Sequence, residues 1–405
     1  MTDLFDKFHP EPESFTAGVI EHRGGAAYPE FSGEIGATMS YRGRPCLVWN
    51  INNYLGLANH PEVRAADAEH ARRWGLAAPM GARIMSGESS ELRALEAELA
   101  EHTGKPEAVV LNYGYQGMVS LIDGLVGRDD TILYDASAHA CILDGIRLHR
   151  GRRFPYPHND VDRLEQLLVK LSGRDRGGVL VITEGVFGMP GTLGALDRIA
   201  DLRRRYGFRL LVDDAHGFGV LGPRGAGAGA AAGVQDDIDL YFATFAKAAA
   251  SVGAFVTGSA AVLGSLRHRM RSQLHAKGLP TAIIAGNRTR LRLIRQLDDR
   301  REQLWTVARG LQHALLDNGF DIGGTDSHIT PVYLDLAPDD AARMTDRLRD
   351  EHDIYCSLVV YPVVPRGIVQ LRIVPTAEHT LADVERTRSA LVAVFPPDGM
   401  KDPRR

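Results

Sequence analysis

The sequence predicts an α/β fold, with a large domain built on a mostly parallel central sheet and a smaller C-terminal α/β domain. Strand-like and helix-like segments alternate over most of the 405 residues, which is the rhythm of βαβ units. Short segments such as "LLVDD" (210–214) are apolar without alternation, as expected of strands buried on both faces of a parallel sheet. After about residue 287 a second, shorter set of strands and helices begins.

The N-terminal part of the sequence predicts a hairpin and a helix. Two strand-like stretches in "ATMSYRGRPCLVWN" (37–50) are joined by an Arg-Gly-Arg turn and predict a hairpin. A helix is predicted over "SSELRALEAELAEHTG" (89–104). Serines precede it, Leu92, Leu95 and Leu99 recur on one face, and a glycine ends it.

The large domain follows as alternating elements. Strands are predicted in "AVVLN", "TILYD", "GVLVITEG" and "RLLVDDAHG", with a helix over "ALDRIADLRRRYG". In open parallel sheets ligands bind at the carboxyl ends of the strands, and the candidate functional residues follow strands in this way. The glycine-rich stretch 225–233 is expected to be a surface loop.

The last third of the chain predicts the small domain. Its strands are "ITPVYLDL", "IYCSLVVYP" and "IVQLRIVP", and its helices are "DAARMTDRLRDEH" and "LADVERTRSALVAVF". We therefore expect four parts in all. They are an N-terminal arm and hairpin (1–55), a large domain (56–287), a small domain (288–395) and a disordered tail (396–405).

Composition excludes several classes of protein. With 44% apolar residues, 24% charged residues and a net charge of −4, the chain has the composition expected of an ordinary soluble globular protein and gives no reason to expect nucleic acid as a partner. Arginines in 287–301 alternate with leucines and acids, which favours a solvated helix face. Three widely spaced cysteines, a polar start and the lack of a long apolar run predict small buried cysteines, no secretory signal and no transmembrane segment. We expect a cytoplasmic protein.

The first chemical candidate is Asp213, which ends an apolar strand. A buried carboxylate there needs a cationic partner. The protonated ring nitrogen of pyridoxal phosphate (PLP) is such a partner, because protonation strengthens the ring as an electron sink. Taken alone, the stretch is equally compatible with a metal carboxylate or a helix cap at Asp213 or Asp214.

The second candidate is Lys247, in "TFAKAAASVG" (244–253). The small residues around it would leave room for a ring, and a desolvated lysine forms Schiff bases. Thr244 could offer a hydroxyl to a phosphate. For an isolated "FAK", an exposed lysine at the start of an alanine-rich helix would be the better interpretation.

Two further strand ends complete the pattern. "LNYGYQG" places Gly114 in a turn before a helix, where backbone N–H groups suit a phosphate. "YDASAHACILDG" places His139 after another strand. A lone histidine is more often structural, but the ordered set of glycine turn, histidine, Asp-x-x-His and Thr-x-x-Lys favours a functional site.

These residues carry a family resemblance over about 50–379. The chain resembles the α-oxoamine synthases, PLP enzymes of fold type I, and is most similar to bacterial serine palmitoyltransferase-like members. The matching stretches are "NNYLGLANHP", "YGYQG", "SAHACILDG", "TEGVFGMPG", "VDDAHGFGVLG", "TFAKAAASVGAFVTG" and "LRIVPTAEH".

The resemblance implies roles around the cofactor and no metal. Lys247 matches the lysine that holds PLP and later moves the α-proton. His139 matches the histidine stacked on the ring, Asp213 the partner of the ring nitrogen, and His216 the histidine near the ring oxygen. The positions that match the phosphate site are Gly114, Tyr115 and Thr244.

The resemblance also implies substrate contacts. Arg372 in "QLRIVP" matches an arginine that grips the substrate carboxylate, where a bidentate ion pair is favoured. Asn52 or Asn53, and Glu184, match polar positions near the amino acid and the cofactor.

Some positions depart from the commoner family pattern. Gly188 stands where many members have serine, and Leu92 replaces a frequent histidine. Ala276 and Lys277 replace a hydroxyl residue that usually reaches the phosphate of the neighbouring subunit. Tyr361 stands where aminooxononanoate synthases often have arginine, which disfavours a dicarboxylic acyl chain.

The implied reaction is a decarboxylative condensation of an amino acid with an acyl thioester in a homodimer with the site at the subunit interface. We expect L-serine and a long-chain acyl-CoA, giving a 3-keto sphingoid base. Glycine or alanine, and a carrier-protein thioester, are the alternatives within the family. An aminotransferase is disfavoured by the match, and a non-catalytic partner subunit is disfavoured by the presence of Lys247.

Overall fold

The computed structural model describes residues 3–6, 29–173 and 177–395. The described chain forms two compact units. One is Asn52–Glu302, and the other combines the residues up to Ile51 with those from Gln303 onward. The domain boundaries expected from the sequence stay predictions, and the expected tail lies outside the described residues.

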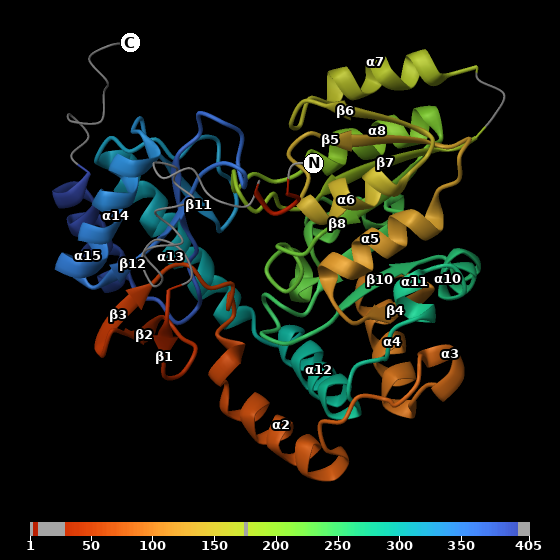
Figure 1. Ribbon diagram of the computed structural model, residues 1–405, viewed down its shortest axis with the longest axis horizontal. Coiled ribbons are helices and arrows are strands. Elements are labelled where there is room, and N and C mark those ends of the chain that lie inside the picture. The colour runs from red at the N-terminus through yellow and green to blue at the C-terminus, as the bar shows by residue number, and fades with distance from the viewer. Residues whose placement is uncertain (1–2, 7–28, 174–176, 396–405) are drawn as a thin grey trace. The chain divides into compact units, whose positions relative to one another are not determined.

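The unit Asn52–Glu302 is built on a seven-stranded sheet in the order β4-β10-β9-β8-β7-β5-β6 (Figure 1). The pairs among β5 to β9 are parallel, and β10 runs antiparallel to β4 and β9. Every strand but β10 therefore ends at the same edge, and the predicted, mostly parallel sheet is confirmed. The strands are β4 (Glu107–Leu111), β5 (Thr131–Asp135), β6 (Arg152–Tyr156), β7 (Val179–Glu184), β8 (Arg209–Asp213), β9 (Leu240–Thr244) and β10 (Ala254–Gly258).

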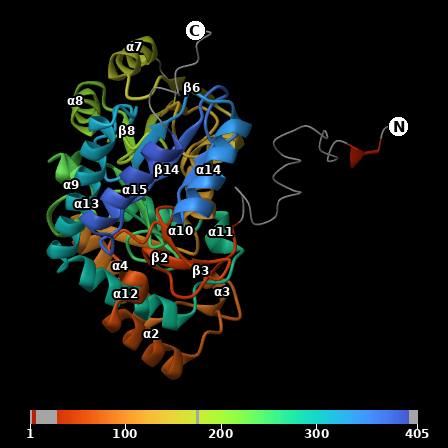
Figure 2. The same ribbon diagram turned by 90° about the vertical axis from the view of Figure 1, so that its left-hand side faces the viewer.

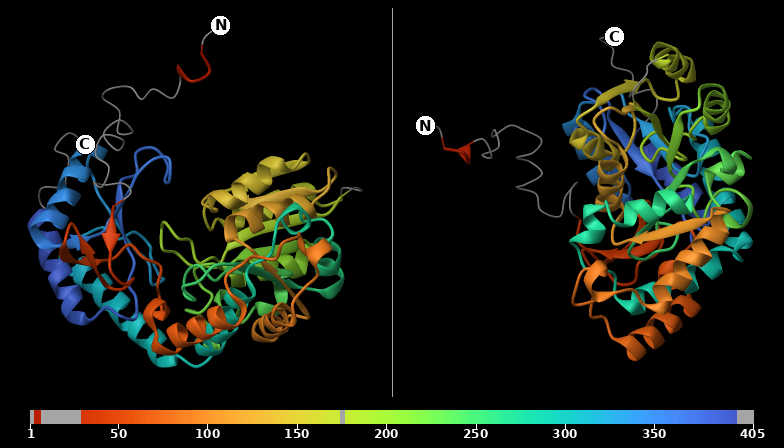
Figure 3. Two further views of the ribbon diagram at one scale, coloured as in Figure 1. Left: turned by 60° about the horizontal axis from the view of Figure 1, so that its bottom comes forward. Right: turned by 90° about the vertical axis from the view of Figure 1, so that its right-hand side faces the viewer.

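Helices flank this sheet, as Figure 3 shows from two sides. The predicted helix α4 (Ser90–Thr103) is confirmed with its caps: the Ser89 side chain accepts the Leu92 N–H, and Gly104 ends the helix with a left-handed φ of 65°. Its leucines are buried, as their spacing predicts. The other helices are α2 (Pro61–Trp74), α3 (Arg83–Ser86), α5 (Gly114–Leu125), α6 (Ala140–Leu148), α7 (Val161–Leu171), α8 (Leu196–Tyr206), α9 (Ala228–Ala231), α10 (Ala260–Arg267), α11 (Arg271–Leu274) and α12 (Thr281–Ile294).

The core of this unit lies between the sheet and α5, α6 and α10. Ile122 of α5, Ile142 of α6 and Leu263 of α10 are fully buried against strand residues such as Ile182 and Leu211. Strand β7 is buried along five of its six residues. A sheet covered on both faces leaves only its edges for ligands, which places any site at a strand end.

The other unit holds two small sheets, in the orders β1-β2-β3-β12 and β11-β14-β13. The predicted hairpin is confirmed as β2 and β3, whose turn takes positive φ at Arg42 and Gly43. Figure 2 shows its helices in blue and blue-green. The elements are β1 (Phe31–Ser32), β2 (Thr38–Tyr41), β3 (Arg44–Val48), α13 (Asp298–Asp317, most of it in this unit), β11 (Thr330–Tyr333), α14 (Pro338–His352), β12 (Ile354–Tyr355), β13 (Ser357–Val359), β14 (Gln370–Ile373) and α15 (Leu381–Val394).

Two expectations about surface segments are wrong. The glycine-rich stretch 225–233 contains the short helix α9 with Ala228 buried, and it packs on Asp214: a methyl group added at Gly227 would lie 2.1 Å from the Asp214 carboxylate. In the arginine-rich segment, Arg290 is 6% exposed and binds Asp67 with two hydrogen bonds of 2.7 and 2.6 Å. Both differences depend on carboxylates that lie far away in the sequence: Asp214 is fully buried, whereas the Asp67 side chain remains 44% exposed and buries only its partner Arg290. A sequence pattern does not reveal such partners.

Two other properties concern the whole described chain. All three cysteines are free and buried, as predicted. Across residues 29–173 and 177–395, none of the helices is both long enough and apolar enough to span a bilayer.

Candidate active site

The carboxyl edge of the seven-stranded sheet gathers most of the predicted site. Glu184 and Asp213 are the last residues of the parallel neighbours β7 and β8 and are paired in register. His139 follows β5, Gly114 follows β4, and Thr244 is the last residue of β9. The topology thus brings polar residues from distant parts of the sequence to one edge.

The start of α5 lies against the end of β9. A methyl group added at Gly114 would lie 3.5 Å from the Thr244 hydroxyl oxygen. No side chain caps α5, so its first backbone N–H groups have neither a cap nor an intrahelical acceptor. The Thr244 hydroxyl donates to the Gly253 carbonyl at 2.9 Å. The helix start therefore supplies the donors that fit a phosphate group.

The two acids after β8 differ in their surroundings. Asp214 is fully buried and accepts hydrogen bonds from Ala228 N–H and Tyr241 O–H, both at 2.8 Å, which makes it a structural acceptor; burial raises its pKa to about 7. Asp213 is 5% exposed, and its Oδ1 accepts the Ala215 N–H at 3.1 Å. Within the described chain its Oδ2 has only the long 4.0 Å contact with the Cys141 thiol.

The electrostatics of Asp213 favour a cationic ligand. Burial raises its pKa, while the charges of Lys247 and His139 lower it. A buried carboxylate with one oxygen facing little more than a thiol is matched by a positively charged N–H group. The donor set at this edge therefore fits the protonated ring nitrogen and the phosphate of PLP.

Glu184 acts on His139 through the backbone. Its Oε1 accepts the His139 N–H at 2.5 Å. Burial and the charge of Asp213 raise the pKa of Glu184 well above its usual range. The His139 ring accepts the Cys141 N–H through Nδ1 at 3.3 Å and so caps α6. Desolvation, with the charge of Lys247, lowers the pKa of His139 against the opposing effect of Asp213, which favours a neutral ring.

His216 is held by a residue that the sequence analysis did not single out. Its Nδ1 lies 2.6 Å from the hydroxyl of Tyr54, and both rings are buried. The Tyr54 hydroxyl also donates to Asn52 Oδ1 at 3.1 Å. Asn53 instead accepts the Ala58 N–H at 3.1 Å within a local turn. Asn52 is therefore linked to the predicted site through Tyr54.

Two further predicted residues, Tyr115 and Arg372, lie in different units of the structure. Tyr115 stands on the first turn of α5 with its ring edge-on to His139, 6.1 Å between centroids, and its hydroxyl donates to Asp144. Arg372 is 8% exposed in the middle of β14, in the other compact unit. Its assignment to the substrate carboxylate stays a prediction.

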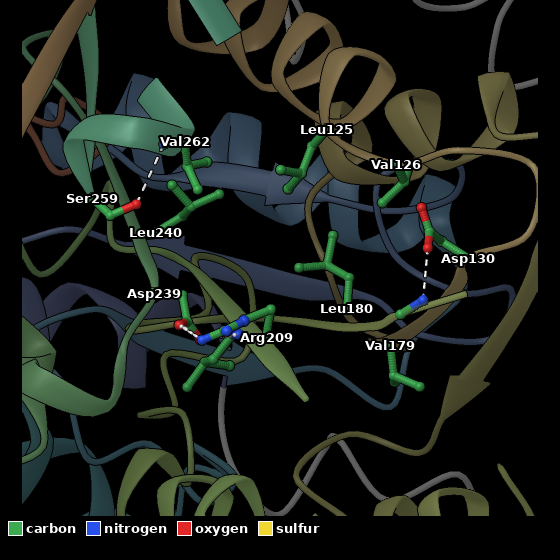
Figure 4. Close-up of a pocket in the computed structure, with 12 residues that line it drawn as sticks. Leu125, Val126, Asp130, Val179, Leu180, Arg209, Asp239, Leu240, Ser259 and Val262 are labelled. Carbon is green, nitrogen blue, oxygen red and sulfur yellow. Dashed lines mark hydrogen bonds and ion pairs between the residues drawn. The ribbon is translucent and has the colours of Figure 1, made fainter. Parts of the chain in front are cut away.

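A separate cavity of about 420 Å³ lies at the opposite edge of the same sheet (Figure 4). Leu125, Leu180, Leu240 and Val262 point into it, and Arg209 is bonded to Asp239. Its strand residues stand at the amino ends of β7, β8 and β9. It does not include any of the predicted site residues.

The fold and this site are those of a fold-type I PLP enzyme, and comparison with known proteins specifies the family. A family model described as "Aminotransferase class I and II" matches residues 44–391. The chain is 48% identical over 397 residues to cysteate-C-fatty acyltransferase of Capnocytophaga ochracea, covering 97% of this chain and 94% of that one. It is 38% identical over 365 residues to 8-amino-7-oxononanoate synthase of Geobacter sulfurreducens, covering 90% and 92%.

Solved structures of similar fold come from the same family as these relatives. Serine palmitoyltransferase of Sphingomonas wittichii superposes with a TM-score of 0.90 at 29% identity, covering 97% of this chain and 99% of that one. A variant of the serine palmitoyltransferase of S. paucimobilis with a bound PLP–myriocin aldimine superposes with a TM-score of 0.88 at 28% identity and the same coverage. The chain belongs to the α-oxoamine synthases, a family of PLP-dependent C-acyltransferases that carry out decarboxylative acyl condensation.

Proposed function

We propose that the protein condenses cysteate with a fatty acyl thioester. A carbon–carbon bond forms between the α-carbon of cysteate and the acyl carbonyl, the thiol and carbon dioxide are released, and the product is a 2-amino ketone that carries a sulfonate. The observation that supports this choice is the 48% identity to a cysteate-C-fatty acyltransferase over nearly the whole chain. Serine, the amino acid expected from the sequence, is the second candidate, because serine palmitoyltransferases are close in fold at 28–29% identity.

The cofactor supplies an electron sink for a carbanion next to the amino nitrogen. In our proposal Asp213 pairs with the ring nitrogen, the N-terminus of α5 binds the phosphate, and His139 stacks on the ring. Lys247 holds the cofactor and transfers the α-proton. His216 would contact the oxygen of the ring.

One substrate contact and two positioning roles are proposed for three further residues. Arg372 binds the substrate carboxylate, Glu184 fixes the backbone of His139, and Asn52 acts through Tyr54. A sulfonate differs from the hydroxyl of serine by a full negative charge. A site that pairs that charge should reject serine strongly, because its donors would be left without an acceptor.

We also propose a homodimer, on the basis of an apolar surface after α2. Four large side chains in the segment 76–85 are strongly exposed: Leu76 (64%), Met80 (81%), Ile84 (59%) and Met85 (83%). Clusters of this kind mark association surfaces. Light scattering should give twice the chain mass, and Met80→Glu with Met85→Glu should shift it toward the monomer. A monomer in the parent protein would contradict the proposal.

The function is tested by product analysis. Purified holoenzyme is incubated separately with cysteate, serine, alanine and glycine, each with palmitoyl-CoA and with a palmitoyl carrier-protein thioester, and products are weighed by mass spectrometry. We expect kcat/KM to be highest for cysteate by at least about 100-fold over serine. A preference for serine would restore the second candidate, and a product that retains the carboxylate carbon would contradict the condensation.

A further inference from the structure

The imidazole of His216 has a neighbour at each of its nitrogens. At Nδ1 it meets the Tyr54 hydroxyl at 2.6 Å. Its Nε2 faces Gly188, where a methyl group added to the glycine would lie 2.4 Å from Nε2 and 3.0 Å from Cε1. The two contacts come from different segments, one before α2 and one in the loop after β7.

The backbone conformation at position 188 does not require a glycine. It is absent from the glycines with positive φ in the described chain, so an alanine could adopt its conformation. The imidazole is what excludes a side chain, because Cβ atoms are essentially never found closer than 3.0 Å to such a neighbour. The ring is buried at 7% exposure and is tied to Tyr54, which is itself fully buried. It therefore has little freedom to move away.

We propose that Tyr54 and Gly188 are positioning residues that together fix the imidazole of His216 at the carboxyl edge of the sheet. The functional part of this inference rests on the proposed function, in which His216 contacts the cofactor. Tyr54 orients the ring by a hydrogen bond, and Gly188 provides the space that Nε2 occupies. A serine at position 188, as in many members of the family, would require a different place for this ring.

The inference predicts that each residue acts only through His216, which mutant cycles can test. In the apoprotein, Gly188→Ala should lower the melting temperature by about 3–10 °C, as expected of overpacking in a domain of this size. In a His216→Ala background the same change should lower it by less than about 1 °C, because the obstructing ring is gone. Gly264→Ala is the matched control: it lies on α10 with nothing within 4 Å of the added methyl group.

The second cycle measures PLP binding by fluorescence titration of the apoprotein. Tyr54→Phe should weaken PLP binding by about 3- to 10-fold, the range for one lost hydrogen bond. In the His216→Ala background it should weaken it less than about 2-fold. Tyr206→Phe is the control, since that hydroxyl bonds to Glu165 at the surface of α8, away from the site.

Equal effects of Gly188→Ala, or of Tyr54→Phe, in the presence and absence of the imidazole would overturn the inference. Failure of the proposed function gives a different result: the parent protein would not bind PLP or would not form the ketone. The melting-temperature cycle on the apoprotein needs no cofactor, so it tests the positioning role of Gly188 even if the proposed function is wrong.

Discussion

Replacing Asp213 by asparagine separates two opposing effects of one buried carboxylate. In the apoprotein burial raises the pKa of Asp213 above its ordinary value. For such a group, stability is greatest at pH values below the unfolded pKa and is lost as pH rises through the folded pKa. At neutral pH the ionised carboxylate therefore lowers the free energy of unfolding of the apoprotein. We expect apo Asp213→Asn to be at least as stable as the parent.

With PLP bound, we expect the Asp213→Asn substitution to lower stability instead of leaving it unchanged or raising it. An asparagine cannot form the charge-assisted hydrogen bond that we propose for the ring nitrogen, and such bonds contribute about 1.5–3 kcal/mol. This corresponds to about 10- to 150-fold weaker PLP binding. At a fixed excess of PLP, the stabilisation gained from binding should fall by the same ~1.5–3 kcal/mol.

The assay is thermal unfolding of both proteins at pH 7.5, without PLP and over a PLP titration. The expected pattern is an apo melting temperature that stays level or rises, together with a smaller PLP-induced increase. Asp213→Glu is a control that keeps the charge. If apo Asp213→Asn were clearly destabilised and its PLP affinity unchanged, Asp213 would be a structural acceptor like Asp214, and our account of the site would fail.

Three other predictions concern single groups. Borohydride treatment of the holoenzyme should fix the pyridoxyl group on Lys247, as peptide mass spectrometry would show; label on another lysine would exclude this role. Arg372→Ala should weaken amino-acid binding by ~1.5–3 kcal/mol and leave PLP affinity intact, and unchanged amino-acid affinity in a spectroscopic titration would refute the carboxylate contact. His379 is fully buried, accepts the Thr376 N–H at 3.1 Å and contacts the Val48 carbonyl at 3.1 Å, and burial lowers its pKa from 6.5 to about 4. Stability should therefore fall as pH drops from about 6.5 to 4, measured by urea unfolding, and a His379→Gln variant with the same pH dependence would contradict this.

The strand-end residues could be predicted from the sequence because their signal is local. An apolar run followed by acids, as at Asp213, indicates a buried strand and its polar end at once. The glycine turn before α5 and the position of Thr244 follow from the same kind of pattern. The topology then brings these ends together, as parallel strands require.

The contacts that orient the site could not be predicted in this way. Tyr54 and His216 are 162 positions apart, and no periodicity relates them. The difference between Asp213 and Asp214 depends on which side of the strand end each carboxylate faces, and Tyr241 and the glycine-rich segment decide that for Asp214. The burial of Arg290 likewise depends on Asp67, a partner on another helix. Side-chain partners are a property of the tertiary structure, which a sequence window does not contain.

The single edge at which the strands end also has a consequence for how the protein assembles. The site residues that belong to the unit Asn52–Glu302 come from segments between residues 52 and 247. They meet only after β4, β5, β7, β8, β9 and the late antiparallel strand β10 have paired. Contacts of such sequence separation form slowly. A nascent chain still lacking β10 would have Thr244 without its Gly253 acceptor. Capture of PLP should therefore mark the last stage of folding of this unit, and the growth of cofactor absorbance during refolding would time it.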